Sequence, residues 1–333
     1  MKIEERVNCF VKLGRTFDQV FSVKNQEKLK IAEQLNPWFT QDFISNAINS
    51  WKLSLSSENL IKWLDRYDLK NDVSSKKILI IMAGNIPLVG FHDLMCALLL
   101  NHSVIIKSSS DDKILVELVV DFLRNFSFFE NKIQIVDNVK GLYFDAVIAT
   151  GSNNSSKYFE YYFKNKKRII RKSRRSLAVL DGNESKLELD GLADDVFMYF
   201  GLGCRNVSKI FVPKDYDLNK LFSSFYKYKN IINHTKYLNN YDYHKSIYLM
   251  GNHDLIENGF LLMKEDNSML SPVSMLFYEY YDNISEVDKF INDNSAFIQT
   301  VVSSTKTVFG ESQSPKLWDY ADGVDTIDFL LNV

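Results

Sequence analysis

The spacing of hydrophobic residues changes near residue 75. Before that point apolar positions recur every three or four residues, as at Leu29, Ala32 and Leu35, which predicts helices with one buried side. After it, short continuous apolar runs alternate with segments of helical spacing. The predicted strands are 77–83, 103–107, 132–136, 143–149 and 177–180, and the predicted helices are 88–100, 112–126 and 155–164. This alternation predicts a parallel, doubly wound α/β sheet.

A second series of apolar runs follows residue 204. The predicted strands are 207–212, 245–250, 260–263, 275–280 and 297–302, with a helix over 284–292 and helical covering structure over 217–243. We therefore expect a second α/β unit. The predicted segments are a helical N-terminal part (1–75), a first α/β domain (76–190) and a second α/β domain with a C-terminal tail (191–333).

Composition limits the classes of function. The chain has 333 residues, of which 46% are hydrophobic and 25% charged, as is typical of a soluble globular protein with about two domains. A net charge of -2 gives no overall attraction to nucleic acid. The N-terminus lacks the pattern of a signal peptide, and no segment has the uncharged length of a membrane span. We expect a cytoplasmic protein without a nucleic-acid partner.

Metal and disulfide chemistry are not expected either. The three cysteines include no Cys-x-x-Cys pair, which argues against structural zinc and against a disulfide framework. The five histidines form no His-Glu-x-x-His motif. We predict no metal site.

The strongest candidate for a reactive side chain is Cys204. Gly201 and Gly203 flank it, so a substrate can approach its backbone closely, and a predicted buried strand follows directly. Arg205 and Lys209 are nearby cations that would favour a thiolate. The alternative is that the cysteine is a small buried hydrophobe, which is the interpretation we give to the other two cysteines. The Asn-Val-Ser triplet that starts two residues after the candidate is treated as an incidental match to a glycosylation motif.

Three loops at the ends of predicted strands carry polar groups that could meet a ligand. Asn85 follows the first strand and either points into a crevice or caps the next helix. Lys107 and Ser109 follow the second strand and suit a ribose or phosphate, although a solvated turn would look the same. The segment Thr150-Gly151-Ser152 joins a strand to a helix N-terminus, which is a ready anion site but lacks the G-x-G-x-x-G motif.

A basic run occupies residues 164–175. Such a run is usually a solvated face. The functional alternative is capture of a phosphate, from a cofactor or from coenzyme A, by arginine side chains.

Taken in order, these motifs resemble the aldehyde dehydrogenase superfamily, and in particular its fatty acyl-CoA reductase branch, which supplies aldehyde in bacterial bioluminescence. The resemblance covers about residues 75–330, and the segments 203–213, 309–315 and 322–325 are most similar to the reductase branch. It implies an aldehyde-dehydrogenase-like fold, with a doubly wound NAD(P)-binding domain and a catalytic domain. It implies Cys204 as nucleophile, Asn85 as a donor to the oxyanion, and cofactor contacts from Lys107, Ser109, Thr150, Gly151 and Ser152.

The sequence departs from the superfamily at two points. Ordinary aldehyde dehydrogenases carry a Glu-Leu-Gly-Gly-Lys segment whose glutamate activates water, and the stretch interpreted as corresponding is Val179-Leu-Asp-Gly-Asn183. Without that base, a thioacyl enzyme would be reduced rather than hydrolysed. Ser156 also replaces the last glycine of the usual Gly-Ser-x-x-x-Gly loop.

The resemblance thus implies reduction of an acyl-CoA or acyl-carrier-protein thioester to an aldehyde, with NADPH as the expected cofactor and NADH as the alternative. Two alternatives remain open: oxidation of an aldehyde to an acyl-CoA on the same fold, and a non-redox acyl-accepting scaffold. The chain is shorter than typical superfamily members, so an oligomerisation arm is expected to be reduced or absent. A homo-oligomer or a partner acyl-transfer protein is compatible with this interpretation.

Overall fold

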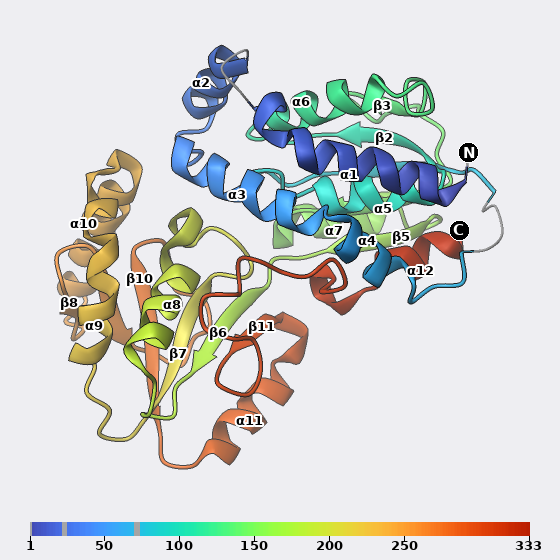
Figure 1. The fold of residues 1–333 in the computed structure, drawn as a ribbon. Helices are drawn as coiled ribbons and strands as arrows, with labels where there is room; N and C mark the ends of the chain where they lie inside the picture. The colour runs from blue at the N-terminus through green and yellow to red at the C-terminus, as the bar shows by residue number, and fades with distance from the viewer. Residues whose placement is uncertain (1, 22–24, 70–73) are drawn as a thin grey trace. The chain divides into compact units, whose positions relative to one another are not determined.

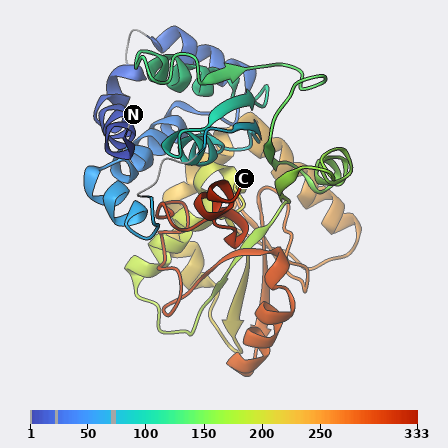
Figure 2. The ribbon, with the colours of Figure 1, turned by 90° about the vertical axis from the view of Figure 1, so that its right-hand side faces the viewer.

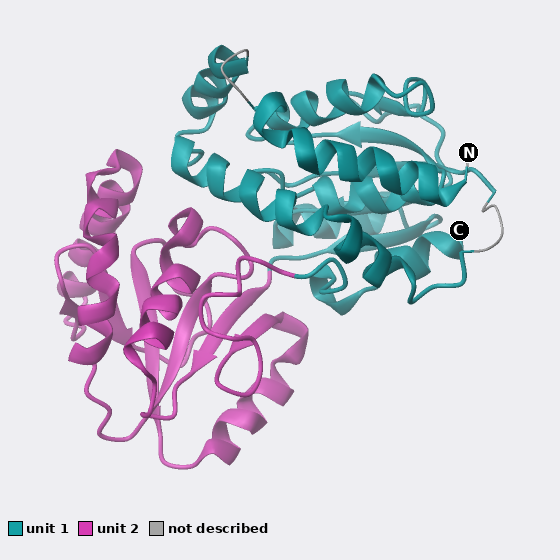
Figure 3. Ribbon diagram, viewed as in Figure 1, with its two compact units in different colours: residues 1–173, 316–333 teal, residues 174–315 magenta. Residues whose placement is uncertain are grey.

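The computed structural model describes residues 2–21, 25–69 and 74–333, and these residues form two compact units. Unit 1 comprises residues 1–173 and 316–333, and unit 2 comprises residues 174–315 (Figure 3). The chain thus leaves unit 1 once and returns to it. No helix in the described part of the chain is long and apolar enough to cross a membrane.

Unit 1 is built on a five-stranded parallel sheet of order β3-β2-β1-β4-β5. Its strands are β1 (Lys77–Ile81), β2 (Ser103–Lys107), β3 (Ile133–Ile135), β4 (Ala146–Thr150) and β5 (Lys167–Arg171). The chain runs from β1 outward to β3 and then crosses back to β4 on the other side of β1. This doubly wound order creates a switch point between β1 and β4.

Helices cover both faces of this sheet (Figure 1 and Figure 2). Because successive strand residues point to opposite faces, Ile78 and Ile80 face a large core, while Leu79 and Ile81 face a smaller one. The large core includes residues of α1 (Ile3–Val20), α2 (Gln26–Leu35), α3 (Gln41–Ser54), α4 (Ser57–Leu64), α5 (Phe91–Leu99), α6 (Lys113–Arg124) and α12 (Thr326–Leu331). The smaller core is covered by α7 (Asn153–Tyr162), through Phe159, and by the segment before β4.

Residues 316–333 are tied to unit 1 by polar contacts as well as by burial. The Trp63 indole donates to the Tyr320 hydroxyl at 2.7 Å, and the Tyr67 hydroxyl donates to Asp325 at 2.6 Å. His102, which is fully buried, accepts from the Lys76 N–H through Nδ1 and contacts the Leu330 carbonyl oxygen through Nε2, at 3.2 and 3.3 Å. The tail therefore completes unit 1.

Unit 2 contains a six-stranded sheet of order β11-β6-β7-β10-β9-β8, parallel except for β8. Its strands are β6 (Arg175–Val179), β7 (Val207–Pro213), β8 (Ile256–Glu257), β9 (Leu262–Glu265), β10 (Met275–Tyr281) and β11 (Ile298–Val302). Its helices are α8 (Lys186–Phe197), the 3-10 turn η2 (Met198–Gly201), α9 (Asn219–Phe225), η3 (Tyr226–Asn233), α10 (Thr235–Met250), α11 (Ile284–Asp293) and η4 (Ser295–Phe297). Phe211 of β7 and Val287 of α11 share one core of this unit.

The α/β class and most predicted elements are confirmed, and three differences stand out. The predicted strand 245–250 is wrong, because these residues end helix α10, whose apolar residues lie on several sides and so give no helical period. Strand β5 lies inside the basic run, where no strand was predicted. The boundary between the two units falls between residues 173 and 174, not at 190. The last 18 residues, 316–333, belong to unit 1 and not to unit 2, because they contact residues that are far away in the sequence.

Candidate functional site

The polar loops predicted in unit 1 gather at one edge of its sheet. Strands β2, β1 and β4 are parallel neighbours, with Ile81 paired to Lys107 and Ile80 to Ile148. Their carboxyl ends therefore lie side by side, next to the switch point between β1 and β4. In doubly wound sheets this is the place where ligands bind.

The loops after β1 and β2 are packed against each other. A Cβ added to Gly84 would lie 2.6 Å from Cβ of Ser109, so only glycine allows this approach. The Leu88 N–H donates to the buried carboxylate of Asp112 at 2.9 Å and stabilises Leu88 at a φ of 57°. Burial raises the pKa of Asp112 well above its usual range. Asp112, which was not predicted, thus fixes the loop that carries Asn85.

Asn85 itself is exposed and lies in the loop between β1 and α5. Helix α5 begins at Phe91 after Gly90, so Asn85 is not its cap. Of the two roles weighed for Asn85, the helix cap is therefore wrong.

The segment after β4 has the geometry of an anion site. Ser152 is the N-cap of α7, and its hydroxyl accepts from the Ser155 N–H at 3.2 Å. Thr150 ends β4, and Gly151 approaches Ser155 too closely for any added Cβ, at 2.9 Å. The N–H groups of the first helical turn and the helix dipole favour a negative group at this position. Ser156 donates to the Asn153 carbonyl within the same turn, so its hydroxyl is already satisfied.

Cys204 lies in unit 2, in the turn between η2 and β7, and is partly exposed. The backbone before it is unusual, because Tyr199, Phe200 and Gly201 all have left-handed φ values, of 53°, 57° and 74°. Non-glycine residues in this region cost about 1–2 kcal/mol each. Such a segment persists only where its surroundings stabilise it.

Asn206 provides much of that stabilisation and is 2% exposed. Its Oδ1 accepts from the Gly203 N–H at 2.8 Å, and its Nδ2 donates to the carbonyls of Asp195 and Met198, at 3.0 and 2.8 Å. The side chain therefore bridges the two ends of the left-handed turn. In the sequence Asn206 is only the first residue of an incidental triplet, and nothing local in the sequence signals its role.

Two further contacts fix the surroundings of this turn. The Ser176 hydroxyl on β6 donates to the Cys204 carbonyl at 2.9 Å. The buried carboxylate of Asp195 accepts from the N–H groups of Gly310 and Ser312, at 2.7 and 3.0 Å. Burial raises the pKa of Asp195 to about 6, although these hydrogen bonds act in the opposite direction.

One cation that was expected near Cys204 is engaged elsewhere. Lys209 is fully buried, and its ammonium donates to Glu279 at 2.5 Å and to the Asp266 carbonyl at 3.0 Å. The ammonium thus has a carboxylate partner of its own. Its predicted role as an activating cation is not supported.

The stretch 179–183 lies at the other edge of the sheet from Cys204. Cys204 precedes β7 and contacts the amino end of β6, whereas Asp181 follows the carboxyl end of β6. Asp181 is five positions after Ser176, the residue of β6 that contacts Cys204, which is a distance of about 16 Å at ~3.3 Å per residue of extended chain. Asp181 and its neighbour Glu184, which accepts from the Asp181 N–H at 2.5 Å, therefore cannot activate a water at Cys204. The stretch consequently says nothing about a base beside the cysteine.

The basic run 164–175 is divided between solvent and the interior of unit 1. Arg171 is buried and paired with Asp93, and it donates to Thr326 at 2.9 Å. The interpretation of the run as a solvated face is wrong for Arg171, because its side chain is inside the unit.

The other cations of the run agree with a solvated face. Arg168 is partly exposed and pairs with Glu160 at 3.0 Å. Lys164, Lys167 and Lys172 are exposed.

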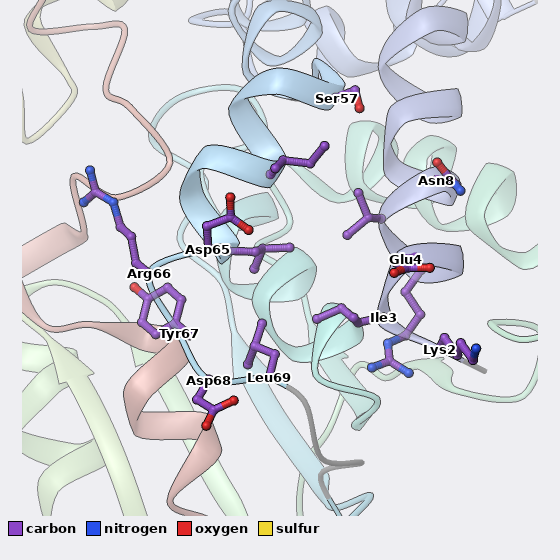
Figure 4. A pocket seen from close by; sticks show the side chains of 14 residues that line it. Lys2, Ile3, Glu4, Asn8, Ser57, Asp65, Arg66, Tyr67, Asp68 and Leu69 are labelled. Carbon is purple, nitrogen blue, oxygen red and sulfur yellow. The ribbon is translucent and has the colours of Figure 1, made fainter.

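A cavity of about 1020 Å³ in unit 1 lies away from the predicted ligand loops. Figure 4 shows its lining, which comes from α1 and from α4 with the residues that follow it. One lining residue, Arg6, donates to the carbonyl of Leu99 at the end of α5, which is the side of the sheet where β2 begins. The cavity is therefore near the amino ends of the strands, opposite the edge that carries Asn85 and Lys107.

The remaining sequence expectations concern cysteines and metals. Cys9 and Cys96 are buried, as predicted, and burial raises the pKa of both thiols. Among the described residues, no group of three or more His, Cys, Asp or Glu side chains is arranged to hold a metal ion.

Comparison of the sequence with models of known protein families identifies the family of this chain. The family model described as "Acyl-CoA reductase (LuxC)" matches residues 12–223, which include the loops of unit 1 and the cysteine turn of unit 2. The chain belongs to the LuxC acyl-CoA reductase family. The resemblance found in the motifs is confirmed, and the protein is an oxidoreductase that acts on aldehyde or acyl groups. A search by sequence among curated proteins finds no match.

Solved structures of other proteins have a fold similar to that of this chain. Aldehyde dehydrogenase 21 from Physcomitrella patens, solved with the product succinate, has a TM-score of 0.71 and 11% identity, covering 100% of this chain and 84% of its own. An indole-3-acetaldehyde dehydrogenase in complex with NAD+ has a TM-score of 0.65 and 14% identity, covering 95% and 75%. The aldehyde dehydrogenase KauB from Pseudomonas aeruginosa has a TM-score of 0.63 and 14% identity, with the same coverage. The aldehyde-dehydrogenase-like fold is thereby confirmed.

Proposed function

We propose that this LuxC-family protein reduces a fatty acyl thioester, as acyl-CoA or acyl-carrier protein, to the aldehyde through a thioacyl intermediate on Cys204. The observation that carries the proposal is the cysteine turn: a partly exposed thiol on a strained backbone that Asn206 and Ser176 stabilise. A backbone stabilised in this way supports a precisely placed nucleophile rather than a packing residue.

The covalent step follows from thiolate chemistry. The Cys204 sulfur attacks the carbonyl carbon of the thioester, a new C–S bond forms, and the bond to coenzyme A breaks with release of its thiolate. In the proposal, the amide of Asn85 and the Cys204 N–H are the donors to the oxyanion of this step. Loss of such a donor typically costs about 3–4 kcal/mol of barrier.

The residues at the carboxyl edge of the unit 1 sheet fit a nicotinamide dinucleotide. Thr150, Gly151 and Ser152 offer a helix N-terminus to a pyrophosphate, and Lys107 with Ser109 offers a cation and a hydroxyl to a ribose. Gly84 and Gly151 allow their loops to pack closely against Ser109 and Ser155, which holds these loops in place. A reduced nicotinamide supplies the hydride that, with a proton, converts the thioester to an aldehyde and returns Cys204 to a thiol. NADPH is the proposed cofactor, and NADH would use the same groups.

A second function, a non-redox acyl-accepting scaffold, was suggested by the missing loop glycine at Ser156. The hydroxyl of Ser156 is satisfied inside α7 and its side chain is buried, so it does not fill the loop before the helix. This observation favours the cofactor-binding interpretation. Aldehyde oxidation to acyl-CoA is the reverse of the proposed reaction and uses the same residues.

The deciding experiment separates acylation from reduction. The protein is mixed with an acyl-CoA in the absence of nucleotide, and its mass and the free fatty acid are followed over time. We expect a stable adduct at Cys204 that disappears when NADPH is added, with aldehyde as the product. An adduct that persists after NADPH is added would favour the scaffold, and rapid release of free acid without nucleotide would contradict the proposal by indicating a thioesterase.

A further inference from the structure

The loop between β1 and α5 exposes Asn85 and buries most of its neighbours. Gly84, Pro87 and Leu88 are buried, whereas Asn85 is exposed. Three positions after Asn85, the backbone of Leu88 has a φ of 57°, a conformation that residues other than glycine rarely adopt. Such a conformation persists only where surrounding groups stabilise it. The direction in which Asn85 projects therefore depends on the groups that stabilise Leu88.

The carboxyl group of Asp112 is one of these groups. Its Oδ2 accepts from the Leu88 N–H at 2.9 Å, although Asp112 stands 24 positions later in the chain, at the start of α6. Asp112 is 2% exposed, so water does not compete for this hydrogen bond. On the other side of Asn85, the Asn36 amide donates to the Gly84 carbonyl at 3.5 Å, which is a longer and weaker contact. Asp112 therefore makes the stronger of these two contacts to the loop.

The environment of Asp112 favours its neutral form. Burial is the main reason that its pKa is raised well above its usual range, and the neighbouring Asp111 acts in the same direction. The second oxygen, Oδ1, is buried and has no hydrogen-bond partner in the part of the chain that the structure describes. A neutral carboxylic acid accepts through one oxygen and carries a proton on the other, and an amide has the same shape, an acceptor and no charge. Asp112→Asn is therefore the conservative variant.

We propose that Asp112 is a positioning residue for Asn85, which holds the backbone at Leu88 so that the Asn85 amide projects as the oxyanion requires. The inference rests on the proposed role of Asn85 as a donor to the oxyanion. Asp112 does not touch the reacting atoms and acts through the short segment from Leu88 back to Asn85. Displacement of a reacting or donating group by about 1 Å can lower a rate by a factor of ~100, so a single hydrogen bond in the supporting loop can change the rate of acylation.

The test is a double-mutant cycle on the acylation of Cys204 in the absence of nucleotide. Dodecanoyl-CoA is mixed with each variant at a series of concentrations, and the adduct is quantified by quenched-flow mass spectrometry. We expect Asp112→Ala to lower the maximal acylation rate about tenfold without changing the half-saturating concentration, because a donor that acts in the transition state is misplaced. In the Asn85→Ala background the same substitution should change the rate by less than about twofold, because the misplaced amide is already absent.

Two further variants separate positioning from a general loss of structure. Asp112→Asn keeps an oxygen that accepts from Leu88, so its rate should stay within about twofold of the wild type. Asp111→Ala removes an exposed carboxylate at the adjacent position and should acylate like the wild type. If Asp112→Ala does not fold, Asp112→Leu supplies the variant without an acceptor, since an apolar side chain there leaves less empty space.

The outcomes distinguish this role from the proposed function. Equal effects of Asp112→Ala in the two backgrounds, or a loss in Asp112→Asn as large as in Asp112→Ala, would overturn the positioning role. Slow acylation in Asn85→Ala together with a wild-type rate in Asp112→Ala would contradict the role of Asp112 alone. A wild-type rate in Asn85→Ala would instead contradict the oxyanion role that the proposed function gives to this amide.

Discussion

The two units carry the residues proposed for function on opposite edges of their sheets. In unit 1, Asn85, Lys107 and Thr150 lie at or after the carboxyl ends of strands, where a helix N-terminus favours an anion. In unit 2, Cys204 stands before the amino end of β7 and against the amino end of β6. A parallel sheet directs helix N-termini to its carboxyl edge, so a binding edge for anions follows from topology. A nucleophile at the amino edge must be placed by its own hydrogen bonds.

The largest expected effect tests whether the covalent step belongs to unit 2 and cofactor binding to unit 1. Cys204→Ala should abolish aldehyde formation, because the covalent step loses its nucleophile and the two other cysteines are buried. Binding of NADPH, followed by quenching of protein fluorescence, should be unchanged, because the groups proposed to hold it belong to unit 1. Residual turnover above a few per cent, or acyl label on Cys9 or Cys96, would contradict the assignment.

A second effect distinguishes the units by pH. Burial lowers the pKa of His102 in unit 1 to about 4, so its contribution to stability is present above about pH 6.5 and is lost as the pH falls toward 4. Asp195 in unit 2 has a pKa raised to about 6, so its contribution is present below about pH 4 and is lost as the pH rises through 6. Between about pH 4 and pH 6.5, a fall in pH should therefore lower the stability of unit 1 and raise that of unit 2, by about 2–3 kcal/mol of unfolding free energy each.

Hydrogen exchange of peptides from each unit measures this contrast. From pH 7 to pH 4.5, after correction for intrinsic rates, protection of α12 should fall and protection around Gly310 should rise. His102→Asn should remove the first change only, and Asp195→Asn the second only. Parallel changes in both units would show that these two groups do not control the response.

The smallest expected effect completes the comparison. Lys107→Ala should raise the Kd for NADPH about tenfold, which is the loss of one charged contact of ~1.4 kcal/mol. The rate of acylation of Cys204 without nucleotide should not change. Lys113→Ala is the matched control, because its ammonium pairs with Asp137 at 3.0 Å on the surface. A slower acylation in the Lys107 variant would show that the two activities are not separable by unit.

Much of this arrangement is readable in the sequence. The apolar runs predict the parallel strands of both units, because buried strands need continuous β-branched or aliphatic residues. The motifs around Asn85, Lys107 and Thr150 predict loops at strand ends, and the structure brings them to one edge. The glycine-flanked cysteine before a strand is also found where the pattern puts it.

Other features depend on contacts between distant residues and leave no local pattern. Asn206 acts through the carbonyls of Asp195 and Met198, and Ser176 through the carbonyl of Cys204, 28 residues later in the chain. Strand β5 is not predicted because it lies in the basic run. Ile169 and Arg171 are buried in alternation with their neighbours, but one of the two is charged and the segment shows no apolar run. The placement of the tail in unit 1 rests on hydrogen bonds from residues more than 200 positions earlier.

The return of residues 316–333 to unit 1 has a consequence for biosynthesis. Unit 2 is complete in the chain before the ribosome has made the segment that Trp63, Tyr67 and His102 bind. The part made first therefore keeps these aromatic and imidazole groups uncovered until the last segment of the chain is available, whereas all strands of unit 2 come from one continuous segment. Closure of the unit 1 core is then a late step of folding, although its first residues are made first.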